Sequence, residues 1–535
     1  MKKRAYGIFL GFCGMIFVLI IYLGWLIQSN PALSAGTGQG RYTITAATVR
    51  GTIYDRAMRP LVNQVKEYRA ALLPSSGALT ALRPSMERQS YLSLVNKLSG
   101  GSPAIARLTG PAASAEGLAL FHIPVRYGVS VPAPHLIGYL DGGEQAGVTG
   151  LEAAYNEVLE RYQGEATATF SVNGAGTYLV GDPAEVHSTV ENARGGIVTS
   201  LDREIQVLTE QVIGSMSFKG AVVILEPDSG DLLACANAPS FHPEAVAESI
   251  QKQDGSLVNR AFSLYDCGSV FKIVTAAAAL EKGISPGREY ACNGWITVSG
   301  TRFHCHQRSL GHQTLTMTEA FAASCNVYFI QLAQEVGGAA LLQMAEKLGL
   351  TDKIVLADTL VAPACVFPTV TELSVPATLA NFSFGQGKLL LSPLHVARMT
   401  AAIANDGVLP EVSLVIGTVN EAGVPKLPEG REGERVLSEG TTAALQTMMK
   451  MVVESGTGRK AQPDGVTAAG KTGTAETGQY TGETPVVQSW FTGYFPAENP
   501  RFVITVLAED ADTYDSNAAE VFCEISNKLI EQKKE

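Results

Sequence analysis

The chain has 535 residues, which is too many for one ordinary hydrophobic core, so we expect at least two globular units. An apolar fraction of 46% with only 17% charged residues excludes an intrinsically disordered chain. The formal net charge of -11 argues against a surface that binds phosphates, so we expect no nucleic acid partner.

The N-terminus predicts a membrane anchor. Residues 1–4 carry the cations Lys2, Lys3 and Arg4, and residues 5–27 form an apolar run without a charge. At about 1.5 Å per residue, this run is long enough to cross a hydrocarbon core about 30 Å thick. Cations before the run and none soon after it place the N-terminus in the cytoplasm. We therefore expect a single-pass protein of the cell membrane, with the bulk of the chain outside the cytoplasm.

A cleaved signal peptide is the alternative interpretation of this segment, because Ala32, Leu33 and Ser34 resemble a small-residue cleavage site. The apolar region of a signal peptide is usually only about 7–15 residues long, which favours an uncleaved anchor.

Two folded units are expected after the anchor. Residues 28–45 are small and polar and predict a spacer. Residues 46–195 open with an alternating segment that suits a strand and a turn. This first unit contains no catalytic constellation, so we expect a spacer or docking domain. Residues 196–533 predict the second unit.

The second unit is expected to be an α+β domain. Residues 220–225 and 232–236 predict one β-hairpin, and residues 489–495 and 502–507 predict another. Residues 471–476 would add a fifth strand beside them. Helical patterns cover residues 271–281, 394–405 and 516–533. This layout predicts a mostly antiparallel sheet made from both ends of the unit, with a helical block inserted between them.

The first of three short motifs in this unit contains Ser269 and Lys272. At this spacing on a helix the two side chains share one face and can form a hydrogen bond. Burial lowers the pKa of a lysine because its charged form loses solvation, which creates a base for the serine proton. The pattern predicts Ser269 as a nucleophile and Lys272 as its base.

The second motif is Ser324-Cys325-Asn326, just before a helical pattern. The Ser324 hydroxyl is suited to relay a proton between Lys272 and a leaving amine, and the Asn326 amide to hold a substrate carbonyl. For Ser324 alone, a helix N-cap is the alternative interpretation.

The third motif, Lys471-Thr472-Gly473-Thr474, suits an edge strand that faces a cleft. Lys471 would supply a cation near Ser324. Thr472 and Thr474 offer hydroxyls to a substrate carboxylate, and Gly473 would let the substrate backbone approach. The backbone amides of Ser269 and Thr474 are our candidates for an oxyanion hole.

Spacing alone is weak evidence for these assignments. Ser249 and Lys252 repeat the spacing of the first motif, but in a polar stretch, and Ser171 and Asn173 repeat the second on the wrong side of the nucleophile. The order and the context of the three motifs carry the interpretation.

On these motifs the chain resembles the class B penicillin-binding proteins, which are peptidoglycan D,D-transpeptidases. Further segments resemble motifs of the family's pedestal and transpeptidase domains: residues 50–56, 150–152, 265–272, 385–387 and 469–476. Cys267 stands where proline is usual. The resemblance implies a penicillin-binding-protein/β-lactamase-like transpeptidase fold, with an antiparallel sheet flanked by helices plus a helical subdomain, an N-terminal pedestal or dimerisation-like domain and one transmembrane helix.

The resemblance also implies the reaction. Ser269 would form an acyl-enzyme with a peptidoglycan stem peptide, with Lys272, Ser324, Asn326 and Lys471 as the other catalytic residues. Thr472, Gly473 and Thr474 would bind the substrate. β-Lactam antibiotics would acylate the same serine, and the protein would serve cell-wall synthesis in cell division or cell shape. A membrane glycosyltransferase is the implied partner.

Several cysteines and histidines of the second unit are candidate metal ligands. Cys292, Cys305 and His312, with His304 and His306 nearby and Cys325 inside the second motif, are residue types that bind zinc. Their spacing fits no compact zinc motif, and Cys292 and Cys305 equally suit a disulfide or two reduced thiols. We assign no metal and no cofactor from the sequence.

Two alternative functions are considered for the chain. A β-lactamase or β-lactam sensor shares the serine chemistry, but no Glu-x-x-x-Asn lies between Asn326 and Lys471, and only four residues precede the apolar run. A mainly scaffolding protein would not need the intact catalytic residues.

Overall fold

The structure, a computed structural model, describes residues 2–29, 40–143, 146–172, 184–216, 218–427, 430, 432–481, 484–511 and 517–532. The chain divides into two compact units. The first contains residues 1–50, 63–126 and 163–193, and the second contains residues 51–62, 127–162 and 194–535.

The boundaries of these units differ from the single boundary near residue 195 that the sequence predicts. Strand β2 (Thr52–Tyr54) pairs in parallel with β8 (Gly196–Thr199), and the backbone N–H of Gly51 donates to the Leu159 carbonyl at 2.8 Å. Segments 51–62 and 127–162 therefore fold with the C-terminal unit, because their backbone groups find partners there.

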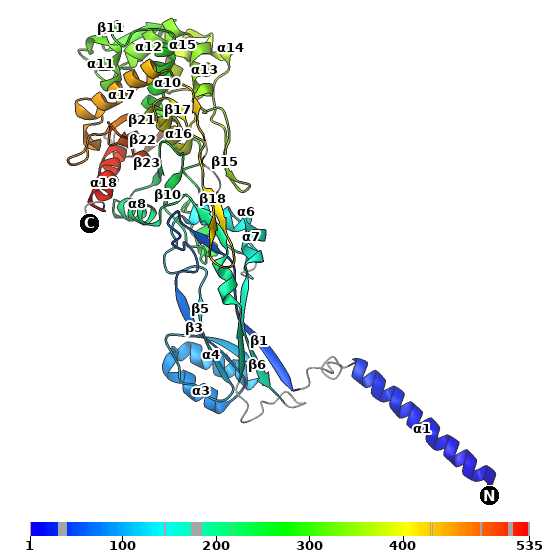
Figure 1. Cartoon of the computed structure of the whole chain (residues 1–535). Coiled ribbons are helices and arrows are strands. Elements are labelled where there is room, and N and C mark those ends of the chain that lie inside the picture. Colours follow the sequence, from blue (N-terminus) through cyan, green and yellow to red (C-terminus); the bar gives the residue numbers. More distant parts are fainter. Residues whose placement is uncertain are drawn as a thin grey trace. The chain divides into compact units, whose positions relative to one another are not determined.

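The first unit contains two antiparallel three-stranded sheets. One has the order β1 (Arg41–Val49), β6 (Gly164–Ser171), β7 (Glu185–Ser188). The other has the order β4 (Ala104–Leu108), β3 (Lys66–Leu72), β5 (Leu118–Pro124). Helices α3 (Ser76–Leu82) and α4 (Arg88–Ser99) lie beside the second sheet (Figure 1), and their buried side chains share a core with it.

Helix α1 (Lys2–Ser29) occupies the segment for which the sequence predicts an anchor. Judged on the residues that the structure describes, no helix is long and apolar enough to cross a membrane. The anchor over residues 5–27 stays a prediction.

The second unit is built on the five-stranded antiparallel sheet that the sequence predicts. Its strand order is β10 (Leu232–Ala238), β9 (Gly220–Leu225), β23 (Phe502–Ala511), β22 (Thr484–Phe495), β21 (Ala469–Thr481). All four neighbouring pairs are antiparallel. Strands from the two ends of the unit meet where β9 pairs with β23, so β21 lies at one edge of the sheet (Figure 1).

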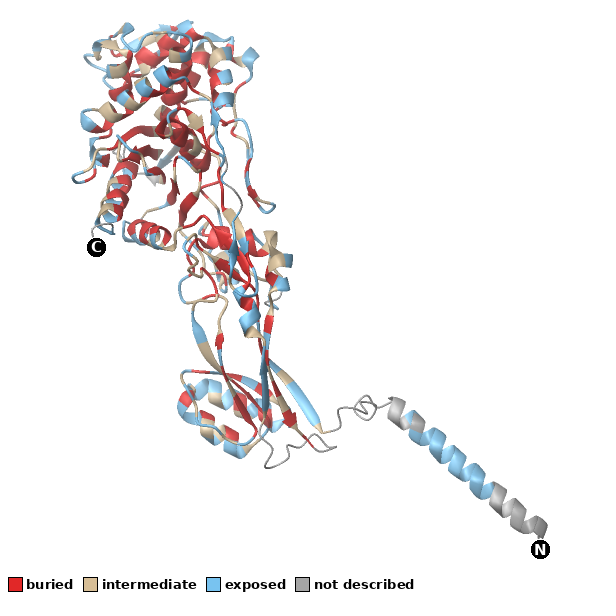
Figure 2. Cartoon of the chain, in the orientation of Figure 1, coloured by how far each residue is buried: buried red, intermediate tan, exposed pale blue. Residues whose placement is uncertain are grey.

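Both faces of this sheet are buried, because successive side chains of a strand point to opposite faces. On β9, Val222 and Ile224 enter one core, whereas Ala221, Val223 and Leu225 enter the other. Helices α8 (Arg203–Ser215) and α18 (Asn517–Gln532) cover the first core, and α16 (Pro393–Ala404) packs over the second. Figure 2 shows the strands and their covering helices as largely buried.

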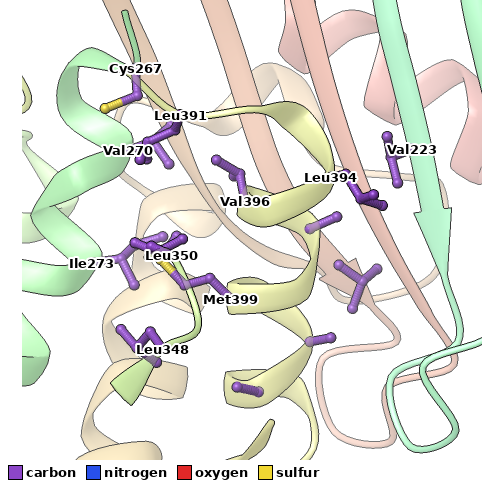
Figure 3. Close-up of a cluster of buried hydrophobic side chains, with 14 of the residues drawn as sticks. Val223, Cys267, Val270, Ile273, Leu348, Leu350, Leu391, Leu394, Val396 and Met399 are labelled. Atoms are coloured by element: carbon purple, nitrogen blue, oxygen red, sulfur yellow. The ribbon is translucent and has the colours of Figure 1, made fainter. Parts of the chain in front are cut away.

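The inserted helical block lies beyond one end of the sheet (Figure 1) and contains the predicted nucleophile helix, α10 (Lys272–Glu281). Figure 3 shows how this helix and the turn before it join the second core. Val270 of the turn and Ile273 of α10 lie near Leu391, which precedes α16, and Met399 of α16. The neighbouring helices of the block are α11 (Met317–Ala322), α12 (Asn326–Val336), α13 (Gly338–Lys347), α14 (Val370–Leu373), α15 (Pro376–Ser383) and α17 (Glu439–Glu454).

Two small hairpins precede α11. Strand β11 (Glu289–Cys292) pairs with β14 (Gln313–Thr316), and β12 (Trp295–Val298) pairs with β13 (Thr301–His304) inside that pair. Each is a separate two-stranded sheet.

Candidate active site

The predicted nucleophile lies in a tight turn at the start of α10. Residues Gly268–Phe271 form a 3-10 turn, and Lys272 begins the α-helix that follows. Because a 3-10 helix has about three residues per turn, Ser269 and Lys272 are stacked on one face. Ser269 is half-buried and Lys272 is fully buried.

The Lys272 ammonium is the centre of the site. Its Nζ lies 2.9 Å from Ser269 Oγ, 3.1 Å from Ser324 Oγ, 2.7 Å from the Ser324 carbonyl oxygen and 2.7 Å from Asn326 Oδ1. Burial lowers the pKa of Lys272 to about 8, because the charged form loses solvation. The predicted contact between nucleophile and base is present.

Ser324 holds an unusual backbone conformation between α11 and α12, with φ +53°. This left-handed conformation is uncommon for a residue with a side chain and is frequent at functional sites. The N-cap of α12 is Cys325, whose Sγ accepts from the Tyr328 N–H. The alternative interpretation of Ser324 as a helix N-cap is therefore wrong, and its hydroxyl faces Lys272.

Lys471 approaches the same hydroxyl from the sheet. Its Nζ donates to Ser324 Oγ at 3.0 Å and to the Thr472 carbonyl oxygen at 3.0 Å. The pKa of Lys471 lies well below its ordinary value, first because the side chain is fully buried and then because it faces Lys272. Without a bound substrate, the charged form of Lys471 that the sequence predicts is therefore disfavoured.

The third motif lies on edge strand β21, as the sequence predicts. Thr472 and Thr474 line the cavity beside Ser269, and Thr472 Oγ1 lies 2.8 Å from Thr457 Oγ1. The structure gives Gly473 a packing role. A Cβ on this residue would lie 2.8 Å from the Cys267 carbonyl oxygen and 2.8 Å from Val270 Cγ2. Gly473 therefore lets the strand approach the nucleophile turn, and its role toward a substrate backbone stays a prediction.

A second close approach fixes the other side of that turn. The N–H of Gly268 donates to the Gly385 carbonyl at 3.1 Å. A Cβ on Gly385 would lie 1.8 Å from the Gly268 carbonyl oxygen. A Cβ on Gly268 would lie 2.4 Å from the Thr474 carbonyl oxygen. The nucleophile turn is held between segment 385–387 and β21. The paired glycines of that segment were the only sequence signal for this role.

The motifs surround a cavity of about 700 Å³. The sequence analysis assigns no role to four further residues of its lining, Arg308, Asn381, Phe384 and Thr457. These come from three separate segments, so no local pattern identifies them. The same cavity is lined by His304 and His306, which neighbour the possible zinc ligands, and by Gln386 and Glu476 from two of the family-like segments.

The duplicate motifs fall elsewhere. Ser249 and Lys252 lie on α9 (Val246–Lys252), which buries no residue. Ser171 ends β6, and Asn173 lies outside the described residues. Burial of the lysine thus distinguishes the first motif from its copy, because Lys272 is fully buried and Lys252 is exposed.

The cysteines form no disulfide in the described part of the chain, and each of the eight is free. Cys267 is fully buried, and burial raises the pKa of its thiol well above the ordinary value. Four potential metal ligands, Cys292, Cys305, His312 and Cys325, lie within 4.8 Å of one another.

Comparisons with known proteins agree with this geometry. Residues 220–530 match the family model described as penicillin binding protein transpeptidase domain. The peptidoglycan D,D-transpeptidase PbpA of Mycolicibacterium smegmatis is 31% identical over 384 residues, which cover 68% of this chain and 74% of that protein.

Solved structures share the fold. Penicillin binding protein 3 from Mycobacterium tuberculosis, complexed with aztreonam, is 26% identical with a TM-score of 0.63, covering 92% of this chain and 97% of that one. PBP2 from Helicobacter pylori, in complex with MreC, gives a TM-score of 0.67 at 20% identity, covering 93% of this chain and 100% of that one.

The close approach at Gly473 gives a first prediction. Gly473→Ala forces β21 away from the nucleophile turn, so we expect a loss of about 1–3 kcal/mol in the free energy of unfolding and slower acylation of Ser269. Denaturant unfolding and penicillin labelling measure both effects. Gly440→Ala is the matched control, because its Cβ would meet nothing within 4 Å on helix α17. An unchanged stability and rate in Gly473→Ala would contradict this role.

Proposed function

Because the chain belongs to the penicillin-binding protein transpeptidase family, we propose that its D,D-transpeptidase activity is carried out by Ser269 as nucleophile and Lys272 as base. Ser324, Asn326 and Lys471 complete the catalytic set. The observation that carries these roles is the convergence of Ser269 Oγ, Ser324 Oγ and Asn326 Oδ1 on the Lys272 Nζ.

Acylation is the first step. Neutral Lys272 takes the hydroxyl proton of Ser269 as Oγ attacks the amide carbonyl between the two D-alanines of a stem peptide. The backbone amides of Ser269 and Thr474 stabilise the oxyanion. Collapse of the tetrahedral intermediate breaks the C–N bond. The leaving D-alanine amine takes its proton from Lys272 through Ser324, whose hydroxyl contacts both lysines.

Deacylation reverses these proton movements. The amine of a neighbouring stem peptide attacks the ester on Ser269 and loses a proton through Ser324 to Lys272. The serine regains its proton, and a new amide cross-links the two peptides. A β-lactam ring opens on the same serine, and the resulting ester blocks it.

Carboxylate recognition is assigned to the sheet edge. Thr472 and Thr474 present hydroxyls to the cavity beside Ser269, and Lys471 lies behind them. A substrate carboxylate placed there favours the charged form of Lys471, because an opposite charge offsets its desolvation. Binding thus restores the cation that burial disfavours.

We also propose that the protein is anchored in the cell membrane by residues 5–27, with the catalytic unit outside the cytoplasm. Two observations support this. The segment carries no charge and follows three cations. Its described side chains in α1, residues 11–23 and 25, are all exposed. A membrane glycosyltransferase is the proposed partner, because cross-linking consumes stem peptides on newly polymerised glycan strands.

The nucleophile is tested by labelling. Ser269→Ala is expected to abolish covalent labelling by a fluorescent penicillin, because the acyl ester forms at that oxygen. Ser249→Ala keeps full labelling, since Ser249 belongs to the copy of the motif on α9, where Lys252 is exposed. Full stoichiometric labelling of Ser269→Ala, read on a denaturing gel and by peptide mass, would refute the assignment.

The base is tested by pH. Because the neutral amine of Lys272 accepts the proton, the second-order rate of acylation should rise with pH and level off above about 8. A lysine with the ordinary pKa of about 10.4 would place that plateau more than two units higher. Stopped-flow acylation at each pH measures the profile, with thermal melting as the control for folding. A flat rate across this range excludes Lys272 as the base.

The anchor is tested by fractionation. The full chain is expected to stay with membranes after an alkaline wash, and a chain without residues 1–29 to be released. Replacing residues 5–27 by an unrelated leucine-rich span is the matched control, which should restore retention. Release of the full chain by the wash would contradict the anchor.

A further inference from the structure

Four potential metal ligands from separate segments meet beside the catalytic cavity. Cys292 ends β11, Cys305 follows β13, His312 precedes β14 and Cys325 caps α12. Their ligand atoms all lie within 4.8 Å of one another. Three of them, Cys292, Cys305 and Cys325, are fully or almost fully buried, and Cys305 also lines the cavity.

The distances within this cluster fit a tetrahedral zinc ion. Cys305 Sγ lies 3.8 Å from Cys325 Sγ and 3.4 Å from His312 Nδ1, and Cys292 Sγ lies 3.6 Å from the same Nδ1. With Zn–S near 2.3 Å and Zn–N near 2.0–2.1 Å, a tetrahedron has S···S edges of about 3.8 Å and S···N edges of about 3.5 Å. These three distances match the edges that one ion requires, and every other pair of ligand atoms lies within 4.8 Å.

The backbone around the cluster is shaped to bring the ligands together. The Cys305 N–H donates to the Gly294 carbonyl at 2.9 Å, and the His312 N–H donates to the Cys292 carbonyl at 3.0 Å. Gly311 has φ +65°, and a Cβ there would lie 2.0 Å from the Cys292 carbonyl oxygen. The chain thus folds back closely on itself where the ligands meet.

The segment that carries three of the ligands has little core of its own. Of residues 289–316, every one of which the structure describes, the buried ones are Cys292, Gly294, Val298, Phe303 and Cys305. Two-stranded hairpins are marginally stable in water, and small units with little core usually need a cross-link. Two of these five buried residues are themselves cluster members.

A disulfide explains the cluster less well. A bridge would use two sulfurs at a bond length of about 2.0 Å, whereas all three thiols here are free and gathered on one imidazole. Three thiolates with one imidazole are a typical donor set for structural zinc, and a closed four-ligand shell leaves no position for substrate.

We propose that Cys292, Cys305, His312 and Cys325 bind one Zn²⁺ as a structural site. The ion ties the two hairpins to the second catalytic motif, because Cys325 stands between Ser324 and Asn326, both of which accept from Lys272. The sequence analysis assigned no metal and left zinc open as one alternative for these residues. The present assignment does not depend on the transpeptidase mechanism.

Metal analysis of the intact protein tests the site directly. The chain purified under reducing conditions should contain close to one zinc per molecule. His312→Ala should fall to about a tenth of that content or less. His312→Cys should keep zinc, because a fourth thiolate replaces the imidazole. Exchange with Co²⁺ should give the intense visible absorption of tetrahedral thiolate coordination in the wild-type protein and in His312→Cys only.

Controls keep the result decisive if a ligand variant folds poorly. Cys235→Ser also places a hydroxyl at a buried cysteine, but away from the cluster, and should keep full zinc content. Titration of the wild-type protein with a mercurial should release zinc in step with thiol modification. The proposal is overturned if the wild-type protein neither contains nor takes up zinc. A native Cys305–Cys325 disulfide, or full zinc content in His312→Ala, would overturn it equally.

Discussion

The site depends on the burial of two lysines around one serine hydroxyl. Ser324 Oγ lies 3.1 Å from the Lys272 Nζ and 3.0 Å from the Lys471 Nζ, and both lysine side chains are fully buried. Two ammonium ions at this separation from one oxygen repel each other, and both lose solvation, so burial favours neutral amines. The fold thereby lowers the pKa of Lys272 to about 8, as the proposed role of this lysine as a base requires. The same arrangement makes the charge of Lys471 responsive to a bound carboxylate.

Backbone proximity holds these groups in place. The nucleophile turn is packed between β21 and segment 385–387, with glycines at the contact points Gly268, Gly385 and Gly473. Side-chain rotamers of Ser269 and Lys272 therefore need little adjustment, because the backbone that carries them cannot shift without steric overlap. Positioning through rigid main chain is effective in catalysis, since small displacements of reacting groups are costly in rate.

The sequence predicts much of the second unit because its signals are local. Apolar runs such as 220–225 identify strands, and the spacing of Ser269 and Lys272 identifies a shared face, so the five-stranded sheet and the nucleophile–base contact are confirmed. The sequence could not show which backbone group lies against Gly473. That group is the carbonyl of Cys267, about two hundred residues earlier in the chain. For the same reason the cysteine–histidine cluster, whose spacing matches no compact motif, becomes evident only when the hairpins and α12 are brought together.

The interleaving of the two compact units has a consequence for synthesis of the chain. The polypeptide passes between them five times, at about residues 50, 62, 126, 162 and 193. Strand β2 leaves the ribosome long before β8, the strand with which it pairs in parallel. The second unit cannot complete its fold early, so β2 stays without its parallel partner until residues 196–199 have emerged. A gene fragment that starts at the catalytic unit's last boundary would leave β8 without its parallel neighbour β2.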